Sequence, residues 1–302
     1  MKISRILFRL LIVIVVSIIT FITYIGIQSA HTWKDTYHTT DKKQLFEDIS
    51  ENSENLITIL LMGIDTQGLA TNNHKGRSDA NILMLLNLQT GKITAVSIPR
   101  DTRVELHPGR YEKLGHAYMY SPELSIKVVE GLLQFPVNFY IAVNEKAFGN
   151  IIDAIGGIEI DAEKVVASKK DNIKEGDQRM NGKTTLDYIR FRNDDKHEGD
   201  FGRMRRQQQV VDAILHQALK PKIFINSNKL FKIAKDNIRH NIPTKIIRTK
   251  GCDLLSISPD NFEKITLQGR NYEVDSIWYV IPDRQNLIDV RKELRIEFEK
   301  SK

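Results

Sequence analysis

The chain has 302 residues, a formal net charge of +6 and an isoelectric point near 9.2, and 41% of its residues are hydrophobic. This length and composition fit one large domain or two modest ones with a substantial core, and the basic excess favours nucleic acid, a membrane surface or a polyphosphate as partner. Cys252 is the only cysteine, which excludes an intrachain disulfide and a zinc cluster built from thiolates.

The first predicted element is a membrane-spanning helix. Leu10–Ile27 is an uncharged apolar run, long enough to cross a bilayer core of about 30 Å at about 1.5 Å per residue. Three basic residues precede it, so the positive-inside rule places residues 1–9 in the cytoplasm and the rest outside the cell. A cleaved signal peptide is the alternative, but its apolar stretch would be unusually long and Gln28-Ser29-Ala30 is a poor cleavage site. We therefore expect a single-pass signal anchor over residues 10–28 in the cell membrane.

A polar stretch over residues 29–55 is typical of an extracellular stalk, and residues 56–302 then form the predicted extracellular domain. Short apolar runs alternate there with amphipathic stretches, which predicts strands alternating with helices. The predicted strands are Ile57–Ile64, Ala80–Leu88, Lys92–Ile98, Val137–Val143, Ile158–Ile160, Lys264–Leu267 and Val274–Val280. The second and third form a hairpin across the turn Gln89-Thr90-Gly91.

The first predicted helix of the domain begins at Ser121 and Pro122, a capping serine followed by a proline in the first turn, and runs towards Phe135. The other predicted helices are Lys146–Ile155, Lys183–Arg190, Phe201–Leu219, Asn226–Asn237 and Arg284–Phe298. These elements predict an α/β or mixed α+β fold, with a central mixed and mostly antiparallel sheet flanked by helices.

The segment Tyr188–Gln209 is unusually rich in arginine, at positions Arg190, Arg192, Arg203, Arg205 and Arg206. The planar guanidinium group suits paired hydrogen bonds to a carboxylate or phosphate. Arg203 and Gln207 are four residues apart and share one face near the start of a predicted helix, where free amides favour an anion. The segment therefore predicts a site for a multiply charged anion, whereas Arg205 and Arg206 are expected to face solvent or to pair with the acidic loop before them.

Three aspartates lie at the ends of predicted strands: Asp65, Asp79 and Asp101. Pro99 lacks an amide donor, so the third strand should end there and present Arg100 and Asp101. Each neighbouring Arg–Asp pair, taken alone, could be a surface ion pair worth about 0–1 kcal/mol. Together, carboxylates and arginines around one crevice suit a pyrophosphate bound with Mg²⁺, which takes one or two carboxylates plus phosphate oxygens.

These motifs resemble the LytR–CpsA–Psr family of Gram-positive cell-envelope proteins. The resemblance rests on GID at 63–65, RSD at 77–79, SIPRD at 97–101, KLGHAY at 113–118, DAIGGIEI at 153–160, YIRFR at 188–192 and GDFGRMRRQQ at 199–208. The motifs span about residues 56–219, and the tail after residue 220 matches only loosely. The family often has asparagine at the position of Gly115.

The resemblance implies a phosphotransferase that moves an undecaprenyl-pyrophosphate-linked glycopolymer, such as teichoic acid or capsular polysaccharide, to N-acetylmuramic acid in peptidoglycan. It implies Mg²⁺, or Mn²⁺ in its place, bound by Asp65 and Asp79, and an apolar tunnel for the polyprenyl tail. Residue by residue, it assigns pyrophosphate binding to Arg77, Arg100, Arg190, Arg192, Arg203 and Gln207. It assigns catalysis to Asp65, Asp79, Arg100 and Arg192, with Asp101 as a further candidate.

Two other classes of function remain open from the sequence alone. One is a membrane-bound transcriptional regulator, but the expected topology separates residues 29–302 from the chromosome, so no nucleic-acid partner is expected. The other is an envelope protein that binds anionic polymer without turnover. Aspartates at the strand ends would repel such a polymer unless a metal intervened, which favours the enzyme.

Overall fold

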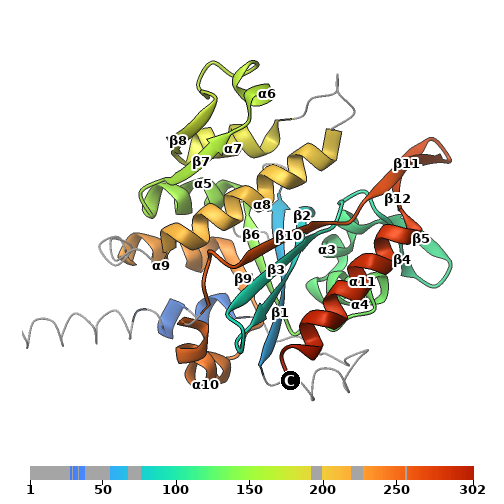
Figure 1. Ribbon diagram of the computed structural model, residues 1–302, viewed down its shortest axis with the longest axis horizontal. Helices are drawn as coiled ribbons and strands as arrows, with labels where there is room; N and C mark the ends of the chain where they lie inside the picture. The colour runs from blue at the N-terminus through green and yellow to red at the C-terminus, as the bar shows by residue number, and fades with distance from the viewer. Residues whose placement is uncertain are drawn as a thin grey trace, which may run out of the picture.

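The computed structural model describes residues 28, 30–32, 34–37, 55–66, 76–191, 199–218, 227–255 and 257–302 (Figure 1). Its centre is a six-stranded sheet with the strand order β10-β3-β2-β1-β6-β9. The strands are β1 (Leu56–Asp65), β2 (Arg77–Asn87), β3 (Lys92–Ser97), β6 (Phe139–Asn144), β9 (Ile238–His240) and β10 (Phe262–Thr266). The pairs β1–β2, β2–β3 and β6–β9 are antiparallel, whereas β1–β6 and β3–β10 are parallel, which confirms the predicted mixed sheet.

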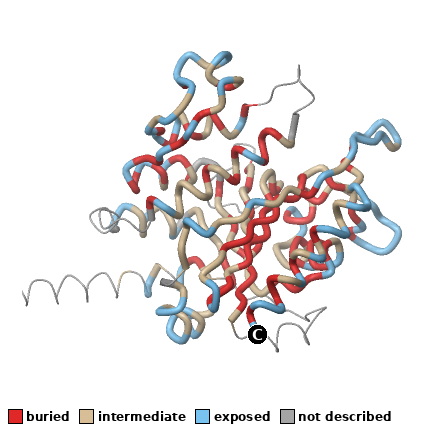
Figure 2. Tube along the Cα trace, viewed as in Figure 1, coloured by how far each residue is buried: buried red, intermediate tan, exposed pale blue. Residues whose placement is uncertain are grey.

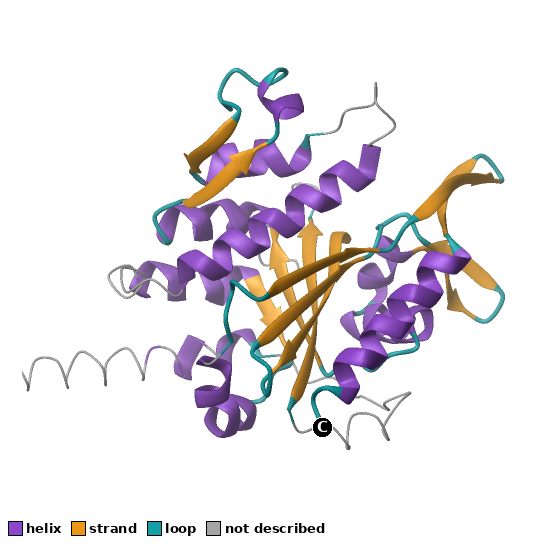
Figure 3. Cartoon of the chain, viewed as in Figure 1, coloured by secondary structure: helices purple, strands orange, loops and turns teal. Residues whose placement is uncertain are grey.

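Helices cover both faces of this sheet, as Figure 3 shows. One layer contains η1 (Leu114–His116), α3 (Ala117–Tyr120), α4 (Pro122–Leu133) and α11 (Arg284–Glu299). The other contains α5 (Glu145–Ala154), α7 (Gly182–Arg190), α8 (Gly199–Ala218) and α9 (Ser227–Asn237). Two short helices complete the described part of the chain: α6 (Lys164–Ala167) and α10 (Thr244–Leu255).

Strand β1 divides its side chains between the two layers. Leu60, Met62 and Ile64 are buried in the core beneath α4 and α11. Leu61 and Gly63 point to the opposite face, towards α8, because successive residues of a strand alternate between faces. Figure 2 shows the central strands as the most continuously buried part of the molecule. The predicted start of α4 is also confirmed, since the Ser121 hydroxyl accepts a hydrogen bond from the Leu124 amide at 3.1 Å.

Three two-stranded sheets lie outside the main sheet: β4 (Arg103–His107) with β5 (Arg110–Lys113), β7 (Ile158–Ala162) with β8 (Gly176–Met180), and β11 (Gly269–Val274) with β12 (Ile277–Pro282). The prediction of one strand over Val274–Val280 is therefore wrong. The chain reverses at Asp275 and Ser276, whose φ angles of 51° and 61° suit a tight two-residue hairpin turn. Strands β4, β5, β8, β9 and β11 and helices η1, α3, α6 and α10 were not predicted.

The predicted membrane segment, residues 10–28, lies outside the described residues except for Gln28, as does most of the predicted stalk. Within the described part of the chain, every helix is too short or too polar to span a bilayer. Thr36, in the predicted stalk, is buried, and its hydroxyl lies 2.9 Å from Nε2 of His240 in β9. Asp35 also pairs with Lys235 of α9 at 3.1 Å. This short piece of the predicted stalk therefore packs against the edge of the domain at β9.

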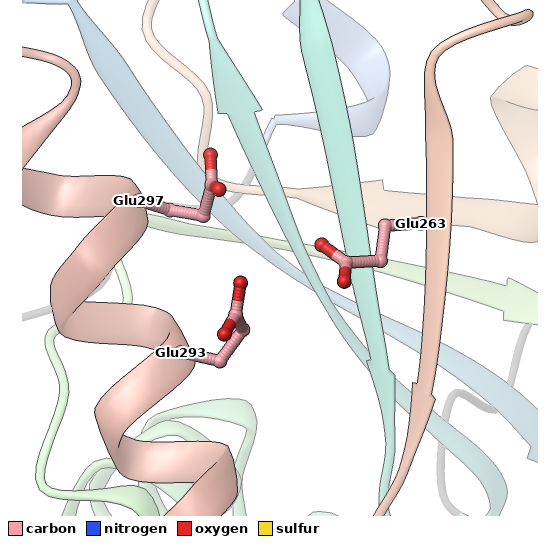
Figure 4. Close-up of side chains that lie close together, drawn as sticks. All are labelled: Glu263, Glu293 and Glu297. Carbon is pink, nitrogen blue, oxygen red and sulfur yellow. The ribbon is translucent and has the colours of Figure 1, made fainter.

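A buried carboxylate fastens α11 to the sheet. The Glu297 side chain is only 1% exposed, and its Oε1 accepts from Lys92 at 2.8 Å and from Lys300 at 2.9 Å. Lys92 also lies 2.6 Å from Glu263 of β10. Figure 4 shows Glu263, Glu293 and Glu297 grouped between α11 and the sheet. Because the Lys92 ammonium contacts two of these three carboxylates, ion pairing explains why the carboxylates lie close together.

Glu297→Gln should therefore destabilise the fold in a pH-dependent way. Burial would raise the pKa of Glu297, but the hydrogen bonds and charges of Lys92 and Lys300 lower it below its usual value of 4.5. A carboxyl group whose pKa is lowered by folding stabilises the protein above its unfolded pKa, and this contribution is lost as the pH falls through the folded pKa. At pH 7 we expect the free energy of unfolding to fall by about 3 kcal/mol, measured by urea unfolding, because a buried ion pair is broken.

The difference between wild type and Glu297→Gln should begin to narrow below about pH 4.5, where the carboxyl of the unfolded chain becomes protonated, and should be lost as the pH falls through the lower pKa of the folded state. Glu299→Gln is the matched control, since Glu299 is exposed and pairs with Lys302 on the same helix end. That variant should change stability by less than about 0.5 kcal/mol. An equal loss of unfolding free energy in the two variants would contradict the stabilising role assigned to the buried Glu297 carboxylate.

Candidate active site

A β-bulge positions Asp79. Gly63 pairs with Ala80 and Ile64 pairs with Ser78, so Asp79 is an extra residue without an opposite partner in β1. Bulges of this kind bend the strand and redirect the extra side chain. Beyond the bulge, Arg77 lies opposite Asp65, and Nη2 of Arg77 is 3.9 Å from Oδ2 of Asp65. The predicted residues Asp65, Arg77 and Asp79 are therefore brought to one edge of the sheet.

The loop after β3 completes the charged cluster. Nη1 of Arg100 donates a hydrogen bond of 2.8 Å to Oδ2 of Asp79. Nε of Arg100 lies 3.5 Å from Asp101, whose other oxygen is 2.9 Å from Nζ of Lys113. Asp79 and Asp101 thus flank Arg100, as expected from a strand that ends at Pro99.

Asp101 is held in its ionised form. Burial would raise its pKa, but the hydrogen bond from Lys113 and the charges of Arg100, Lys113 and Arg203 lower it below its ordinary value. The contribution of Arg203 shows that α8 brings a third cation close to this cluster. Because a carboxylate with a lowered pKa accepts a proton poorly, Asp101 is suited to orient Arg100 and Lys113 rather than to act as a general base.

Two cavities meet at this cluster. A cavity of about 100 Å³ lies between the sheet and the helices α5, α7 and α8, and its apolar lining comes from Leu61, Met62, Ala80, Ile82, Val143, Phe148, Ile189, Val210 and Val211. A polar cavity of about 80 Å³ is lined by Arg77, Asp79, Arg100, Asp101, Lys113, Gly115 and His116. Asp79 lines both cavities, and Asp65 and Gln207 are the other polar residues of the apolar one.

Helix α8 supplies two further predicted residues. Arg203 is 6% exposed, and Gln207, one turn later, lines the apolar cavity. The prediction that Arg203 and Gln207 share one face of a helix is confirmed. Arg190 is the exposed last residue of α7 and lines neither cavity, whereas Arg192 lies outside the described residues. The pyrophosphate-binding roles of Arg190 and Arg192 therefore stay predictions.

The LytR_cpsA_psr family model matches residues 21–296. The chain belongs to the LytR_cpsA_psr family. It is 28% identical over 280 residues to the polyisoprenyl-teichoic acid–peptidoglycan teichoic acid transferase TagU of Bacillus subtilis, covering 92% of this chain and 90% of that protein. The transferase TagV of the same organism is 31% identical over 312 residues, which cover 98% of this chain and 78% of TagV.

A solved structure of another LytR_cpsA_psr protein, YwtF (TagT) with bound octaprenyl pyrophosphate lipid, superimposes with a TM-score of 0.63. It is 27% identical, and the match covers 82% of this chain and 92% of that one. The family's general architecture therefore extends over most of this chain.

Arg206 has a structural role that the sequence analysis did not predict. It was expected to face solvent or to pair with the acidic loop, but its side chain is only 1% exposed and its Nη1 lies 2.9 Å from Glu163. Its Nη2 donates to the Phe191 carbonyl, and its guanidinium carbon lies 5.4 Å from the Phe191 ring centroid. Arg205 is exposed as expected, and it also pairs with Glu163, at 2.9 Å.

Several lining residues were not predicted. Lys113 and His116 lie in the polar cavity because η1 runs very close to β2: a Cβ on Gly115 would come 2.9 Å from the Ser78 carbonyl oxygen. The motif KLGHAY contains both side chains and was a usable signal. Phe148 and Ile189 in the apolar cavity had no such signal, because cavity and core residues have the same apolar spacing.

The acidic residues suit a divalent cation that also binds phosphate. Oδ1 of Asp79 is buried and has no hydrogen-bond partner within the described part of the chain, while Oδ2 accepts from Arg100. Asp65 lines the same cavity and is 29% exposed. Among the described residues, these two carboxylates are too few to enclose Mg²⁺, but they match its usual binding through one or two carboxylates plus substrate phosphates.

Arg205→Ala and Arg206→Ala should show that the two neighbouring arginines contribute differently to stability, although both pair with Glu163. Arg206→Ala should lower the free energy of unfolding by about 3 kcal/mol, because it leaves Oε2 of the partly buried Glu163 and the Phe191 carbonyl without their guanidinium partner. Arg205→Ala should cost less than about 1 kcal/mol, since Arg205 is exposed. Urea unfolding of both variants measures the difference, and a larger loss for Arg205→Ala would contradict this assignment.

Proposed function

We propose that this chain is a membrane-anchored phosphotransferase that moves a glycopolymer from a polyisoprenyl pyrophosphate carrier to peptidoglycan. The observation that carries the proposal is that Asp79 lines both an apolar cavity and a cavity walled by cations. Such a site suits a ligand with a hydrocarbon tail joined to a multiply charged anion. The names of TagU and TagV support teichoic acid as the class of donor.

The apolar cavity would hold the first part of the isoprenoid tail. Its walls combine branched aliphatic side chains of β1 and β2 with Phe148 and Ile189 from the helices. Burial of apolar surface contributes about 25 cal/mol per Å², so a long hydrocarbon tail would contribute much of the binding energy. The octaprenyl pyrophosphate bound by TagT supports this assignment.

The pyrophosphate would lie where the two cavities meet. Arg77, Arg100 and Arg203 supply positive charge there, with Gln207 on the same face of α8. Arg190 and Arg192 are proposed to join them. In the structure, Arg100 is oriented by Asp79 and Asp101 before any substrate arrives, so little reorganisation would be needed.

Asp65 and Asp79 would hold Mg²⁺, or Mn²⁺ in its place. The bound ion would offset charge on the phosphate oxygens as the leaving group departs. Oδ1 of Asp79, buried and without a hydrogen-bond partner among the described residues, supports this role. Asp101 would stay ionised and keep Arg100 and Lys113 directed into the site.

In the proposed reaction, an N-acetylmuramic acid hydroxyl oxygen forms a bond to the sugar-proximal phosphorus. The bond from that phosphorus to the bridging oxygen breaks, and polyisoprenyl phosphate leaves with the bonding electron pair. The hydroxyl proton passes to the carboxylate pair Asp65 and Asp79. The product is a phosphodiester between the glycopolymer and peptidoglycan, and undecaprenyl phosphate is the expected carrier product.

The same proposal places residues 10–28 in the cell membrane as a signal anchor and residues 29–302 outside the cell. The apolar run Leu10–Ile27 behind three basic residues supports this topology. A reporter enzyme active only outside the cytoplasm, fused after Lys302, should be active in whole cells. Activity only of a cytoplasmic reporter at the same position would overturn the proposal and make a nucleic-acid partner possible.

Asp79→Asn and Arg100→Ala should each lower transfer by at least about a hundredfold, because each removes charge at the reacting phosphate. Transfer of a lipid-linked glycopolymer to peptidoglycan fragments measures the loss, and chelation of Mg²⁺ should abolish wild-type activity reversibly. Asp260→Asn is the control, since Asp260 is exposed and pairs only with His216 among the described residues. Full activity in Arg100→Ala would exclude the proposed site.

A further inference from the structure

Two hairpins project from the domain directly beside the polar cavity. In Figure 1, β4–β5 and β11–β12 lie together, away from helices α5 to α9. They are joined to the site through the backbone: the Val280 amide of β12 donates to the carbonyl of Asp101 at 2.8 Å, and Thr102 forms a bridge with Val280. The position of β12 therefore depends on the same loop that presents Arg100 and Asp101.

The face of the β4–β5 hairpin leads outward from the polar cavity. Arg103 pairs with Lys113 and Glu105 pairs with Tyr111, so these four side chains share one face. Lys113 lines the polar cavity, whereas Tyr111 is 46% exposed. The hairpin thus carries a continuous row of side chains from the reacting centre to solvent.

Arg103 connects this row to the second hairpin. Its guanidinium carbon lies 4.1 Å from the ring centroid of Tyr111 and 5.9 Å from that of Tyr279 in β12. Tyr279 pairs with Tyr272, and Ile277 lies two residues away on the same face. Tyr272 is 52% exposed and Ile277 is 46% exposed. We call this group, made of Tyr111, Arg103, Tyr272 and Ile277 together with the buried Tyr279, the aromatic strip.

A cavity of about 400 Å³ lies next to the strip. Its polar lining comes from Arg103, Glu105 and Lys127, and the rest comes from Val104 and Leu106 of β4, Tyr111 and apolar residues of α4. Aromatic faces carry negative charge density that attracts the C–H groups on the flat side of a sugar ring, while arginine, glutamate and lysine hydrogen-bond its hydroxyl and amide groups. The strip and cavity together therefore suit a saccharide chain rather than a purely apolar or purely anionic ligand.

We propose that the aromatic strip and its cavity bind the glycan strand of the peptidoglycan acceptor. The inference rests on the proposed function, because it uses the direction of the transfer reaction. In an in-line displacement, the attacking hydroxyl approaches opposite to the leaving group. The leaving lipid phosphate belongs to the apolar cavity, so the acceptor enters from the polar cavity, where the row of side chains begins at Lys113.

The placement of the strip also argues against contact with the bilayer. Thr36, close to the predicted membrane anchor, packs on β9 at one edge of the six-stranded sheet. The hairpins follow β3 and β10 in the chain, and these two strands lie at the opposite edge. The strip and its cavity together mix charges of both signs, with Glu105 of the cavity beside Arg103, whereas a surface for anionic lipid headgroups would be uniformly basic.

The test uses the full chain in detergent micelles and a short glycan fragment of alternating N-acetylglucosamine and N-acetylmuramic acid. Tyr111→Ala and Tyr272→Ala should each weaken fragment binding about three- to tenfold, measured by calorimetry, because each removes one stacking ring. Tyr111→Phe keeps the ring and should bind nearly as wild type. Ile288→Ala, at an exposed position of α11 outside the strip, is the control and should have no effect.

Steady-state transfer gives the second readout. In Tyr111→Ala and Tyr272→Ala, the KM for the acceptor should rise by a similar factor, with kcat and the KM for the lipid-linked donor within about twofold of wild type. A rise in the donor KM alone would assign the strip to the donor glycopolymer, and weakened binding to anionic vesicles with unchanged glycan binding would assign it to the membrane. Either result overturns the proposal. If the wild-type protein transfers no glycopolymer, the proposed function is refuted. The glycan-binding measurements would still test whether the aromatic strip binds the acceptor.

Discussion

The site depends on the balance of charge around Arg100. Its guanidinium lies between Asp79 and Asp101, and Lys113 holds the far oxygen of Asp101. Partly buried charges are tolerated only when they are paired, so the end of β1, the bulge in β2, the loop after β3 and the end of β5 must converge before any of these side chains is stable in place. The same pairing lowers the pKa of Asp101 and so keeps this carboxylate ionised beside a region that would receive a pyrophosphate.

Helix α8 shows how one arginine-rich sequence serves two purposes. Arg203 and Gln207 belong to the face directed at the cavities, whereas Arg206 turns towards Phe191 and Glu163. Since consecutive residues of a helix are rotated by about 100°, residues 203 and 206 lie about 60° apart, on neighbouring parts of the helix surface that contact different partners. The first contributes charge to the site, and the second ties α8 to the loop after α7 and to the start of α6.

The central sheet and half of the site could be predicted because their signals are local. Alternating apolar residues identify β1, β2 and β3, and the strand ends then locate Asp65, Asp79 and Arg100. The two outer hairpins could not be predicted in this way, because neither buries a complete apolar face and β11 and β5 are largely polar. The burial of Arg206 was missed for a different reason: its partner Glu163 lies more than 40 residues away in sequence, on another element.

Because of the bulge at Asp79, the residues of β2 before and after it pair with β1 in different registers. From Ala80 onward, β2 keeps the register that packs Leu83 and Leu85 into the core. Before the bulge, the ladder is shifted by one residue, and this shift sets Arg77 opposite Asp65. In a regular strand, Ser78 would face Asp65 and Arg77 would lie beyond the end of β1. The additional residue at the bulge therefore makes the placement of the charged side chains at the end of β2 independent of the core packing in its middle. Either part can then vary in sequence without displacing the other.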